Sequence, residues 1–331
     1  FGISYTPYLS KLVNDISLGN ITYFNRLNER SAFAASFKYF SLGEIELIQD
    51  EFSEALVTKP NELTMDVSYS LRLADQFSMG VSLRYLRSDL KISQVDDTAI
   101  AASSYAVDLS GYYQGEEQAY NDFNGRWRAG FIIQNLGPKI KYDESAVSAS
   151  FLPTMLRLGG GFDFILDSYN KVSVTAEFAK LLVPTPPILG TFTDYNDANG
   201  NGIFDEDEDQ IGQAYTGIIS GKPNDVDFLA GVFQSFSDAP GGFSEELREF
   251  TWSLGAEYTY EDSFALRAGF FNESEDKGAR KFLALGAGFK FTGTNIDLSY
   301  LFSASKVPSP LENTLRFSLT FNFGDNEYYE Y

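Results

Sequence analysis

The chain has 331 residues, in which 25 lysines and arginines stand against 46 aspartates and glutamates, giving a formal net charge of −21. It contains no cysteine and no histidine, which excludes catalytic triads with a histidine base, thiolate nucleophiles, imidazole or thiolate metal sites and disulfide scaffolds. The acidic balance, with no cluster of basic residues, argues against nucleic acid as a partner and against polybasic binding to anionic lipid, whereas a metal held by oxygen ligands remains possible.

The hydropathy of the chain and its first residues set two further expectations. No run of about 18 or more apolar residues occurs, so a bundle of membrane-spanning helices is not expected. The chain opens at Phe1 with neither an initiator methionine nor a basic segment ahead of an apolar core. We therefore expect any signal peptide to lie upstream of this sequence or to have been removed.

Alternation of apolar and polar residues runs through nearly the whole chain and predicts β-strands. A first strand is expected over Phe1–Leu9, and about thirteen more from Ile16 onward. Helical periodicity is scarce, with Ser244–Phe250 as one short candidate. The clearest hairpins, each with a short turn, are Leu63–Leu73 with Phe77–Tyr85, Leu156–Leu166 with Val172–Phe178, Phe250–Tyr260 with Phe264–Phe270, and Phe282–Phe291 with Ile296–Phe302.

Two architectures compete for this pattern. A soluble β-sandwich buries its apolar face in a core, whereas a transmembrane barrel turns that face to lipid and keeps its polar face inward. The polar face carries charges in mid-strand, which either architecture accommodates. These charges are Asp66, Arg72, Arg84, Asp108, Arg128, Arg157, Asp163, Glu177, Glu257, Arg267, Lys290, Asp297 and Arg316.

Three further features favour the membrane barrel. The connections between strands alternate between short and long, with short turns after residues 24, 73, 166, 260 and 291 and longer loops after 40, 135, 178 and 272. Gln114–Gly125 is an exception, because it is long but must lie at the end of the barrel that carries the short turns. The last strand, Arg316–Phe323, resembles the C-terminal signal of bacterial outer-membrane proteins. Aromatic residues gather at strand ends, as in interfacial girdles: Tyr39, Phe40, Tyr112, Tyr113, Tyr258, Tyr260, Phe289 and Phe291.

These features predict an all-β fold, a transmembrane barrel of the bacterial outer membrane with about 14 antiparallel strands and periplasmic short turns. Residues 1–331 would form one barrel domain, with a long extracellular insertion over 179–247 and a C-terminal tail over 324–331. The mixed charges predict internal ion pairs and a plug rather than a selective pore. The run Gly159–Gly161 lacks the context of a phosphate-binding loop and indicates a close-packed or kinked strand.

The insertion opens with an apolar, proline-rich segment, Leu181–Leu189. Prolines fix φ and lack an N–H donor, so we expect a stiff, extended segment without ladder hydrogen bonds. It either packs over the barrel mouth or forms a docking surface for another protein. The candidate partner-facing residues are Pro186, Pro187, Ile188 and Leu189.

An acidic stretch from Asp197 to Glu208 matches the calcium-loop pattern D-x-[DN]-x-[DN]-G-x5-E. Gly202 would permit the sharp turn, and the ion would be structural. The flanking helices of an EF-hand are missing, so an acidic, solvated loop is the alternative interpretation. The candidate Ca²⁺ ligands are Asp197, Asn199, Asn201, the carbonyl of Ile203, Asp205 directly or through water, and a bidentate Glu208.

Three motifs together resemble a known family. They are the opening FGISYTPYL followed by LVNDISLG, the Asn135-Leu136-Gly137-Pro138 run in IIQNLGPKIKY, and P-T-x-L-R-L-G-G-G at Pro153–Gly161. Over nearly the whole chain the sequence resembles the PorV family, outer-membrane components of the Bacteroidetes type IX secretion system in the FadL-like barrel superfamily. Such proteins carry a lumenal segment ahead of the first strand, so we expect this numbering to begin inside the mature chain.

The resemblance implies a carrier rather than an enzyme. Family members associate with an SprA-type translocon, collect secreted substrates by their C-terminal signal domains, and pass them to a PorU-type sortase for surface attachment. A FadL-like channel for hydrophobic molecules is the alternative, which the charged lumen disfavours. A third class, an outer-membrane lipid hydrolase, generally needs a histidine base, which this chain lacks.

Overall fold

The computed structural model describes residues 1–8, 15–48, 56–91, 99–143, 149–196, 210–305 and 311–323. The chain divides into two compact units. The barrel unit comprises Phe1–Leu181 and Phe250–Tyr331, and the insertion unit comprises Leu182–Glu249. No helix in the described residues is long and apolar enough to cross a membrane.

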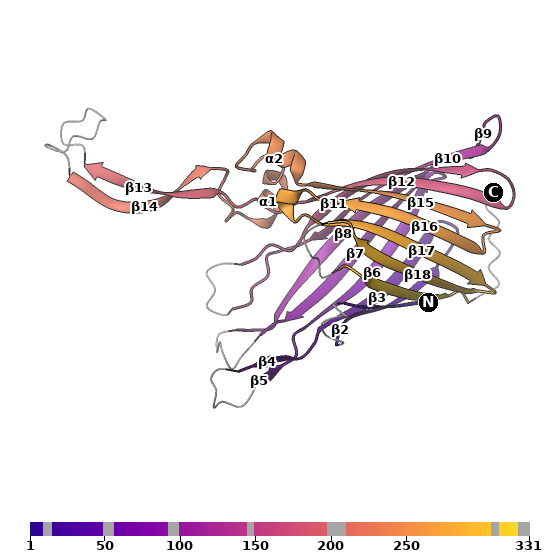
Figure 1. Cartoon of the computed structure of the whole chain (residues 1–331), viewed down its shortest axis with the longest axis horizontal. Coiled ribbons are helices and arrows are strands. Elements are labelled where there is room, and N and C mark those ends of the chain that lie inside the picture. Colours follow the sequence, from indigo (N-terminus) through magenta and orange to yellow (C-terminus); the bar gives the residue numbers. More distant parts are fainter. Residues whose placement is uncertain are drawn as a thin grey trace. The chain divides into compact units, whose positions relative to one another are not determined.

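The barrel unit is a closed antiparallel sheet of fourteen strands (Figure 1), which confirms the predicted fold. Each strand pairs with its neighbours in chain order, and the barrel closes because the last strand pairs with the first. The strands are β1 (Gly2–Pro7), β2 (Ile16–Arg26), β3 (Ser31–Leu42), β6 (Asn61–Ala74), β7 (Phe77–Asp89), β8 (Ala102–Gln114), β10 (Asn124–Leu136), β11 (Met155–Ile165), β12 (Asn170–Leu181), β15 (Phe250–Tyr260), β16 (Phe264–Asn272), β17 (Lys281–Phe291), β18 (Thr294–Ser303) and β19 (Thr314–Phe321).

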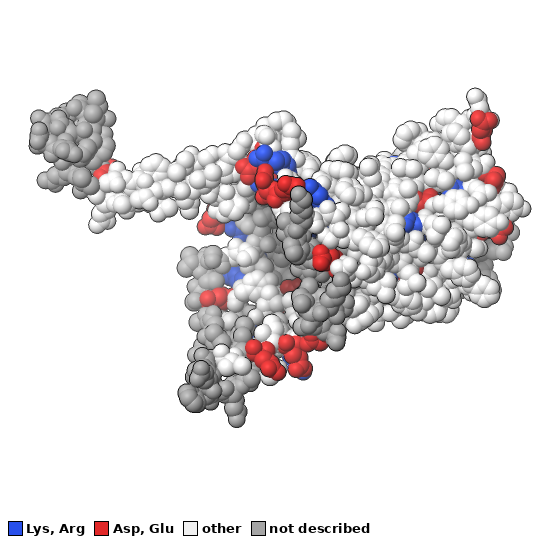
Figure 2. Space-filling view, in the orientation of Figure 1, with Lys and Arg blue, Asp and Glu red and all other residues white. Residues whose placement is uncertain are grey.

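Alternation along each strand turns apolar side chains outward and polar ones inward. In β6, Met65 and Val67 are 51% and 57% exposed, while Asp66 between them is 6% exposed. On the face seen in Figure 2, charged side chains gather toward the two ends of the barrel. The outer wall therefore has the apolar surface of a membrane barrel, and the polar residues line the lumen.

Short turns lie at one end of the barrel and long connections at the other, as predicted. Asp75 and Gln76 join β6 to β7, and the turn between β15 and β16 uses positive φ at Glu261 and Asp262. The Gln114–Gly125 exception contains a two-residue strand, β9 (Gln118–Ala119), which pairs with the start of β10. At the long-connection end, β4 (Ile45–Leu47) pairs with β5 (Leu56–Thr58), and η1 (Glu275–Lys277) lies between β16 and β17.

The insertion unit contains a two-stranded hairpin and two short helices. The hairpin joins β13 (Ile188–Asn196) to β14 (Gln210–Ser220), and the helices are α1 (Phe228–Gln234) and α2 (Phe243–Arg248). The predicted helix thus forms but ends at Arg248, because Phe250 already enters β15.

The prediction that Leu181–Leu189 makes no ladder hydrogen bonds is wrong at both ends of the segment. Leu181 pairs with Met155 at the end of β12, and Leu189 pairs with Ile218 in the insertion hairpin. Proline removes a donor only at its own position, so strand pairing resumes directly after Pro187.

Candidate functional site

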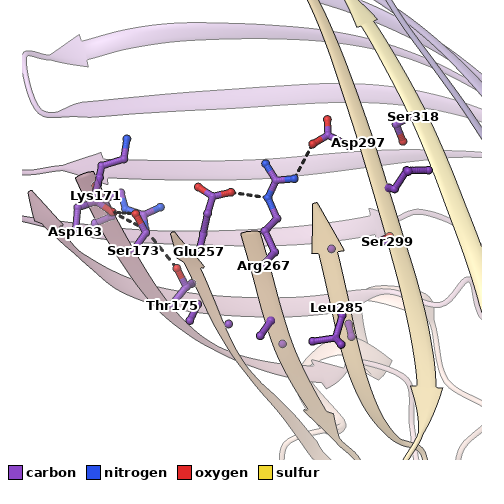
Figure 3. A pocket seen from close by; sticks show the side chains of 18 of the residues that line it. Asp163, Lys171, Ser173, Thr175, Glu257, Arg267, Leu285, Asp297, Ser299 and Ser318 are labelled. Atoms are coloured by element: carbon purple, nitrogen blue, oxygen red, sulfur yellow. Dashed lines mark hydrogen bonds and ion pairs between the residues drawn. The ribbon is translucent and has the colours of Figure 1, made fainter. Parts of the chain in front are cut away.

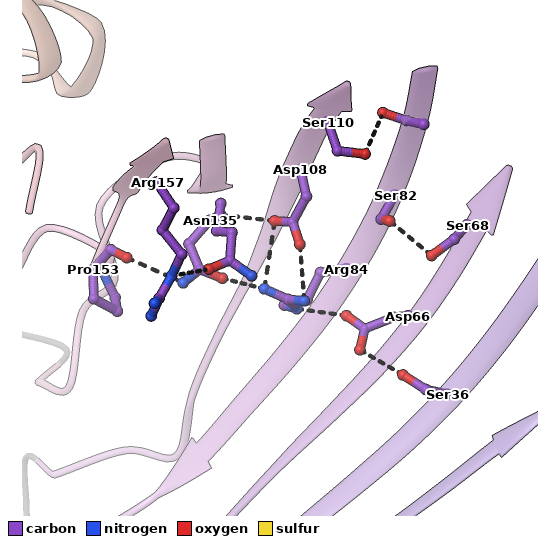
Figure 4. A network of polar contacts seen from close by, with 12 residues as sticks. Ser36, Asp66, Ser68, Ser82, Arg84, Asp108, Ser110, Asn135, Pro153 and Arg157 are labelled. Carbon is purple, nitrogen blue, oxygen red and sulfur yellow. Dashed lines mark hydrogen bonds and ion pairs between the residues drawn. The ribbon is translucent and has the colours of Figure 1, made fainter. Parts of the chain in front are cut away.

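An ion-pair network centred on Arg84 fills part of the lumen (Figure 4). Its guanidinium lies 2.5 Å from Asp66 Oδ1 and 3.0 Å from Asp108 Oδ2. Both carboxylates are only 6% exposed, and the Ser36 hydroxyl donates to Asp66 Oδ2 over 2.8 Å. Because buried charges require partners, this network holds β3, β6, β7 and β8 in register.

Asn135 connects this network to two of the three motifs on which the family resemblance rests, its own and the one that begins at Pro153. It adopts a left-handed backbone conformation with φ of 58°, and its N–H donates to Asp108 Oδ1 over 2.7 Å. Arg84 donates a hydrogen bond to the side-chain carbonyl of Asn135. The side-chain NH₂ of Asn135 in turn donates to the Pro153 carbonyl over 3.1 Å. The Thr154 hydroxyl donates to the Asn135 carbonyl over 2.9 Å. These two motifs therefore meet at one structural junction.

After Asn135 the chain turns into the lumen beside β8. A Cβ on Gly137 would lie 2.2 Å from the Tyr105 carbonyl oxygen, so only glycine allows this approach. Ile140 and Leu152 then pack against Ala102 and Ala106 on the inner face of β8, all at most 4% exposed. Ile140 and Leu152 thus lie on the lumenal side of β8.

A cavity of about 700 Å³ lies between the inner faces of β8, β10, β11, β12 and β15 to β19 (Figure 3). Arg267 bridges Glu257 at 2.5 Å and Asp297 at 2.6 Å. On the neighbouring strands, Asp163 lies 3.4 Å from Arg126 and 2.9 Å from Arg128. The predicted internal ion pairs are therefore present, and charged and polar side chains line the cavity together with alanines and leucines.

The candidate partner-facing residues lie at the start of the insertion hairpin. Ile188 and Leu189 are 53% and 57% exposed, Pro186 is exposed, and Pro187 is partly buried. Ile219 on the adjacent strand is also exposed. We refer to these exposed apolar side chains at the start of the hairpin together as the hairpin surface.

Sequence reasoning missed a second apolar surface, on the two short helices of the insertion unit. Phe233 of α1 and Phe243 of α2 are 75% and 77% exposed, and Leu229 and Leu247 are exposed beside them. The spacing of Leu229 and Phe233, four residues apart, is the signal that predicts one helix face. Because α1 has only seven residues, this helical spacing could not be distinguished in the sequence.

Buried carboxylates hold the proline-rich segment to the rest of the insertion unit. Asp238 is 1% exposed and accepts a 3.0 Å hydrogen bond from the Thr185 N–H, while the Thr185 hydroxyl donates to Glu249 over 2.8 Å. Glu246 accepts from the Ala239 N–H over 2.8 Å. Burial raises the pKa of Asp238, against the lowering effect of the Thr185 N–H.

The predicted calcium ligands, Asp197–Glu208, lie outside the described residues. Their flanks are described: β13 ends at Asn196, which is paired with Gln210 at the start of β14. Strands rather than helices therefore flank the loop. Within the described ranges, no group of three or more acidic side chains is arranged to hold a metal ion.

Comparison with known proteins gives one family match and a set of similar folds. The family model described as "Type IX secretion system protein PorV" matches residues 1–188, which include the Asn135–Pro138 and Pro153–Gly161 motifs. No curated protein matches the chain.

Similar solved structures include two toluene transporters and a FadL homologue. The Pseudomonas putida toluene transporter TodX is 12% identical with a TM-score of 0.48, covering 97% of this chain and 88% of its own. The Ralstonia pickettii toluene transporter TbuX is 12% identical with a TM-score of 0.44, covering 98% and 88%. A Pseudomonas aeruginosa FadL homologue is 12% identical with a TM-score of 0.39, covering 98% and 89%.

Proposed function

The chain belongs to the PorV family and is an outer-membrane component of the type IX secretion system, and from this premise we propose that it acts as a non-catalytic carrier. It would bind the SprA-type translocon, take up secreted substrates by their C-terminal signal domains, and deliver them to the PorU-type sortase. The observation that supports this proposal best is the apolar surface of the insertion unit.

The insertion unit exposes large side chains where a free polar surface would be expected. Ile188, Leu189, Phe233 and Phe243 are each more than half exposed. Full burial of such a side chain contributes about 1.5–3 kcal/mol, so a few of them suffice for a stable protein contact. Large apolar side chains that are exposed close together in the sequence, as Ile188 and Leu189 are, are candidates for an interaction site.

The lumen supports a carrier better than an enzyme or an apolar channel. Its carboxylates at Asp66, Asp108 and Asp163 are each held in an ion pair with an arginine. A channel for hydrophobic molecules needs an apolar path, whereas charged and polar side chains line this cavity.

The test is co-purification of the translocon with variants of the hairpin surface. Deletion of residues 184–190 should abolish recovery, but it also removes Thr185, which anchors the segment to Asp238 and Glu249. The double variant Ile188→Glu and Leu189→Glu is sharper, because it changes only exposed side chains. We expect at least a tenfold loss of translocon recovered from outer membranes.

The matched control places the same charges on the same strand. Thr191 and Thr193 are exposed residues of β13, and Thr191→Glu with Thr193→Glu should leave recovery unchanged. Barrel folding is followed in parallel by the heat-dependent shift in gel mobility. Full recovery with the Ile188 and Leu189 double variant in a folded barrel would refute the hairpin surface as the contact.

A further inference from the structure

The cavity in the lumen carries an excess of positive charge, although the chain as a whole is acidic. Five cationic side chains line it against three carboxylates, an excess of two positive charges. The cations are Arg126, Arg128, Lys171, Arg267 and Arg316, and the carboxylates are Asp163, Glu257 and Asp297.

The ion pairs leave two of these cations without a carboxylate in the cavity. Asp163 is shared by Arg126 and Arg128, and Arg267 bridges the other two carboxylates. Among the described residues, Lys171 has only a 3.9 Å contact with Asp262, an exposed residue of a short turn. Arg316 makes no side-chain hydrogen bond or ion pair with any residue that the structure describes.

Arg316 is placed to face a ligand in the cavity. Its neighbours Leu315 and Phe317 point to the outer wall and are 49% and 39% exposed, so Arg316 projects inward. Ser299 is its direct partner on β18, and Ser318 lies two residues along β19 (Figure 3). A guanidinium fork with hydroxyl donors nearby matches the oxygens of a phosphate group.

We propose that this cavity binds a small phosphomonoester. Such a group carries close to two negative charges at neutral pH, which balances the excess in the cavity. A volume of about 700 Å³ suits a small organic ligand. Gln114, the last residue of β8, and Lys171 place the cavity near the short-turn end, from which the ligand enters.

Glycines on the inner face provide the space for the ligand. A Cβ on Gly269 would meet only the Leu254 carbonyl oxygen at 3.6 Å and Ala284 Cβ at 4.0 Å, and one on Gly255 only the Ala268 carbonyl oxygen at 4.0 Å. A larger side chain is therefore tolerated by the strands and fills the cavity. Gly269→Leu serves as a steric variant that leaves every lumen charge in place.

The experiment is isothermal titration calorimetry on the detergent-solubilised full chain, with glucose 6-phosphate and glucose as probes. We expect the unaltered chain to bind glucose 6-phosphate and not glucose. The affinity for glucose 6-phosphate should be at least tenfold weaker in Arg316→Gln, and binding should be abolished in Gly269→Leu. Arg72→Gln is the matched control, since Arg72 is also an inner-face arginine outside the cavity, and affinity should stay within twofold. Far-UV circular dichroism verifies that each variant is folded.

Three results would overturn the proposal. One is equal binding of glucose and glucose 6-phosphate, and another is the absence of binding at millimolar glucose 6-phosphate. The third is an equal loss of affinity in the Arg316 and Arg72 variants, which would show a non-specific charge effect. If Arg316→Gln does not fold, Gly269→Leu decides the question, because retained binding there excludes this cavity.

Discussion

At the scale of single residues, the family motifs act through backbone geometry and buried polar contacts. Asn135 takes the left-handed conformation that few residues other than glycine and asparagine adopt readily, and its side chain bonds to Arg84 and to the Pro153 carbonyl. Gly137 allows the close approach to β8. These residues therefore shape the wall of the lumen.

The Arg84 network yields a prediction about stability. Arg84→Met would leave Asp66 and Asp108 buried without their cation, and loss of one member of a buried ion pair costs about 3–5 kcal/mol. We expect the free energy of unfolding to fall by that amount in urea titrations of the barrel refolded into lipid vesicles. Arg72→Met, at an inner-face arginine without a described ion pair, should change it by less than about 0.5 kcal/mol. Equal effects of the two substitutions would contradict the structural role of the network.

At the scale of elements, periodicity predicted the barrel strands well because each has one lipid-facing and one lumenal side. Leu63–Leu73 and Phe77–Tyr85 became β6 and β7 with boundaries shifted by a few residues. The same reasoning failed in the insertion unit. There β13 and β14 expose apolar side chains such as Leu189 and Ile219, so no polar face alternates with an apolar one. The lumenal cavity was also beyond prediction, because it depends on which side chains meet across distant strands.

A second prediction concerns calcium binding by the loop of the insertion hairpin. Pairing of Asn196 with Gln210 brings the two ends of the 197–209 loop together, as a closed cation-binding loop requires. We expect calcium to slow cleavage of this loop by a broad-specificity protease at least fivefold, and a chelator to reverse the effect. Glu208→Gln removes the proposed bidentate ligand and should abolish the calcium dependence.

The control for this experiment is Glu206→Gln, which removes one charge at a position that is not a ligand in the motif. Its calcium dependence should match that of the unaltered chain. If both variants and the unaltered chain are cleaved at the same rate with and without calcium, the stretch is an acidic, solvated loop.

At the scale of the whole molecule, the barrel unit is organised with its apolar residues outward. Large apolar side chains such as Leu83, at 61%, and Val67 are among its most exposed, while charged groups such as Asp163, at 3%, are among its most buried. Within the described residues, the barrel buries few large apolar side chains and depends on lipid to bury its outer wall. The aromatic excess of the composition is thus distributed on a lipid-facing surface.

This organisation predicts opposite tolerance to charge on the two faces of one hairpin. Leu83 faces outward near the middle of β7, and Leu83→Arg should lower the free energy of unfolding from lipid vesicles by about 2–4 kcal/mol. Ser70 faces inward on the paired strand, and Ser70→Arg places the same group in the aqueous lumen, so its effect should stay below about 1 kcal/mol. The measurement is urea-dependent tryptophan fluorescence of both variants in vesicles of one lipid composition. Equal destabilisation by the two substitutions would mean that the outer wall is not in contact with lipid, and would require an apolar protein partner around the barrel instead.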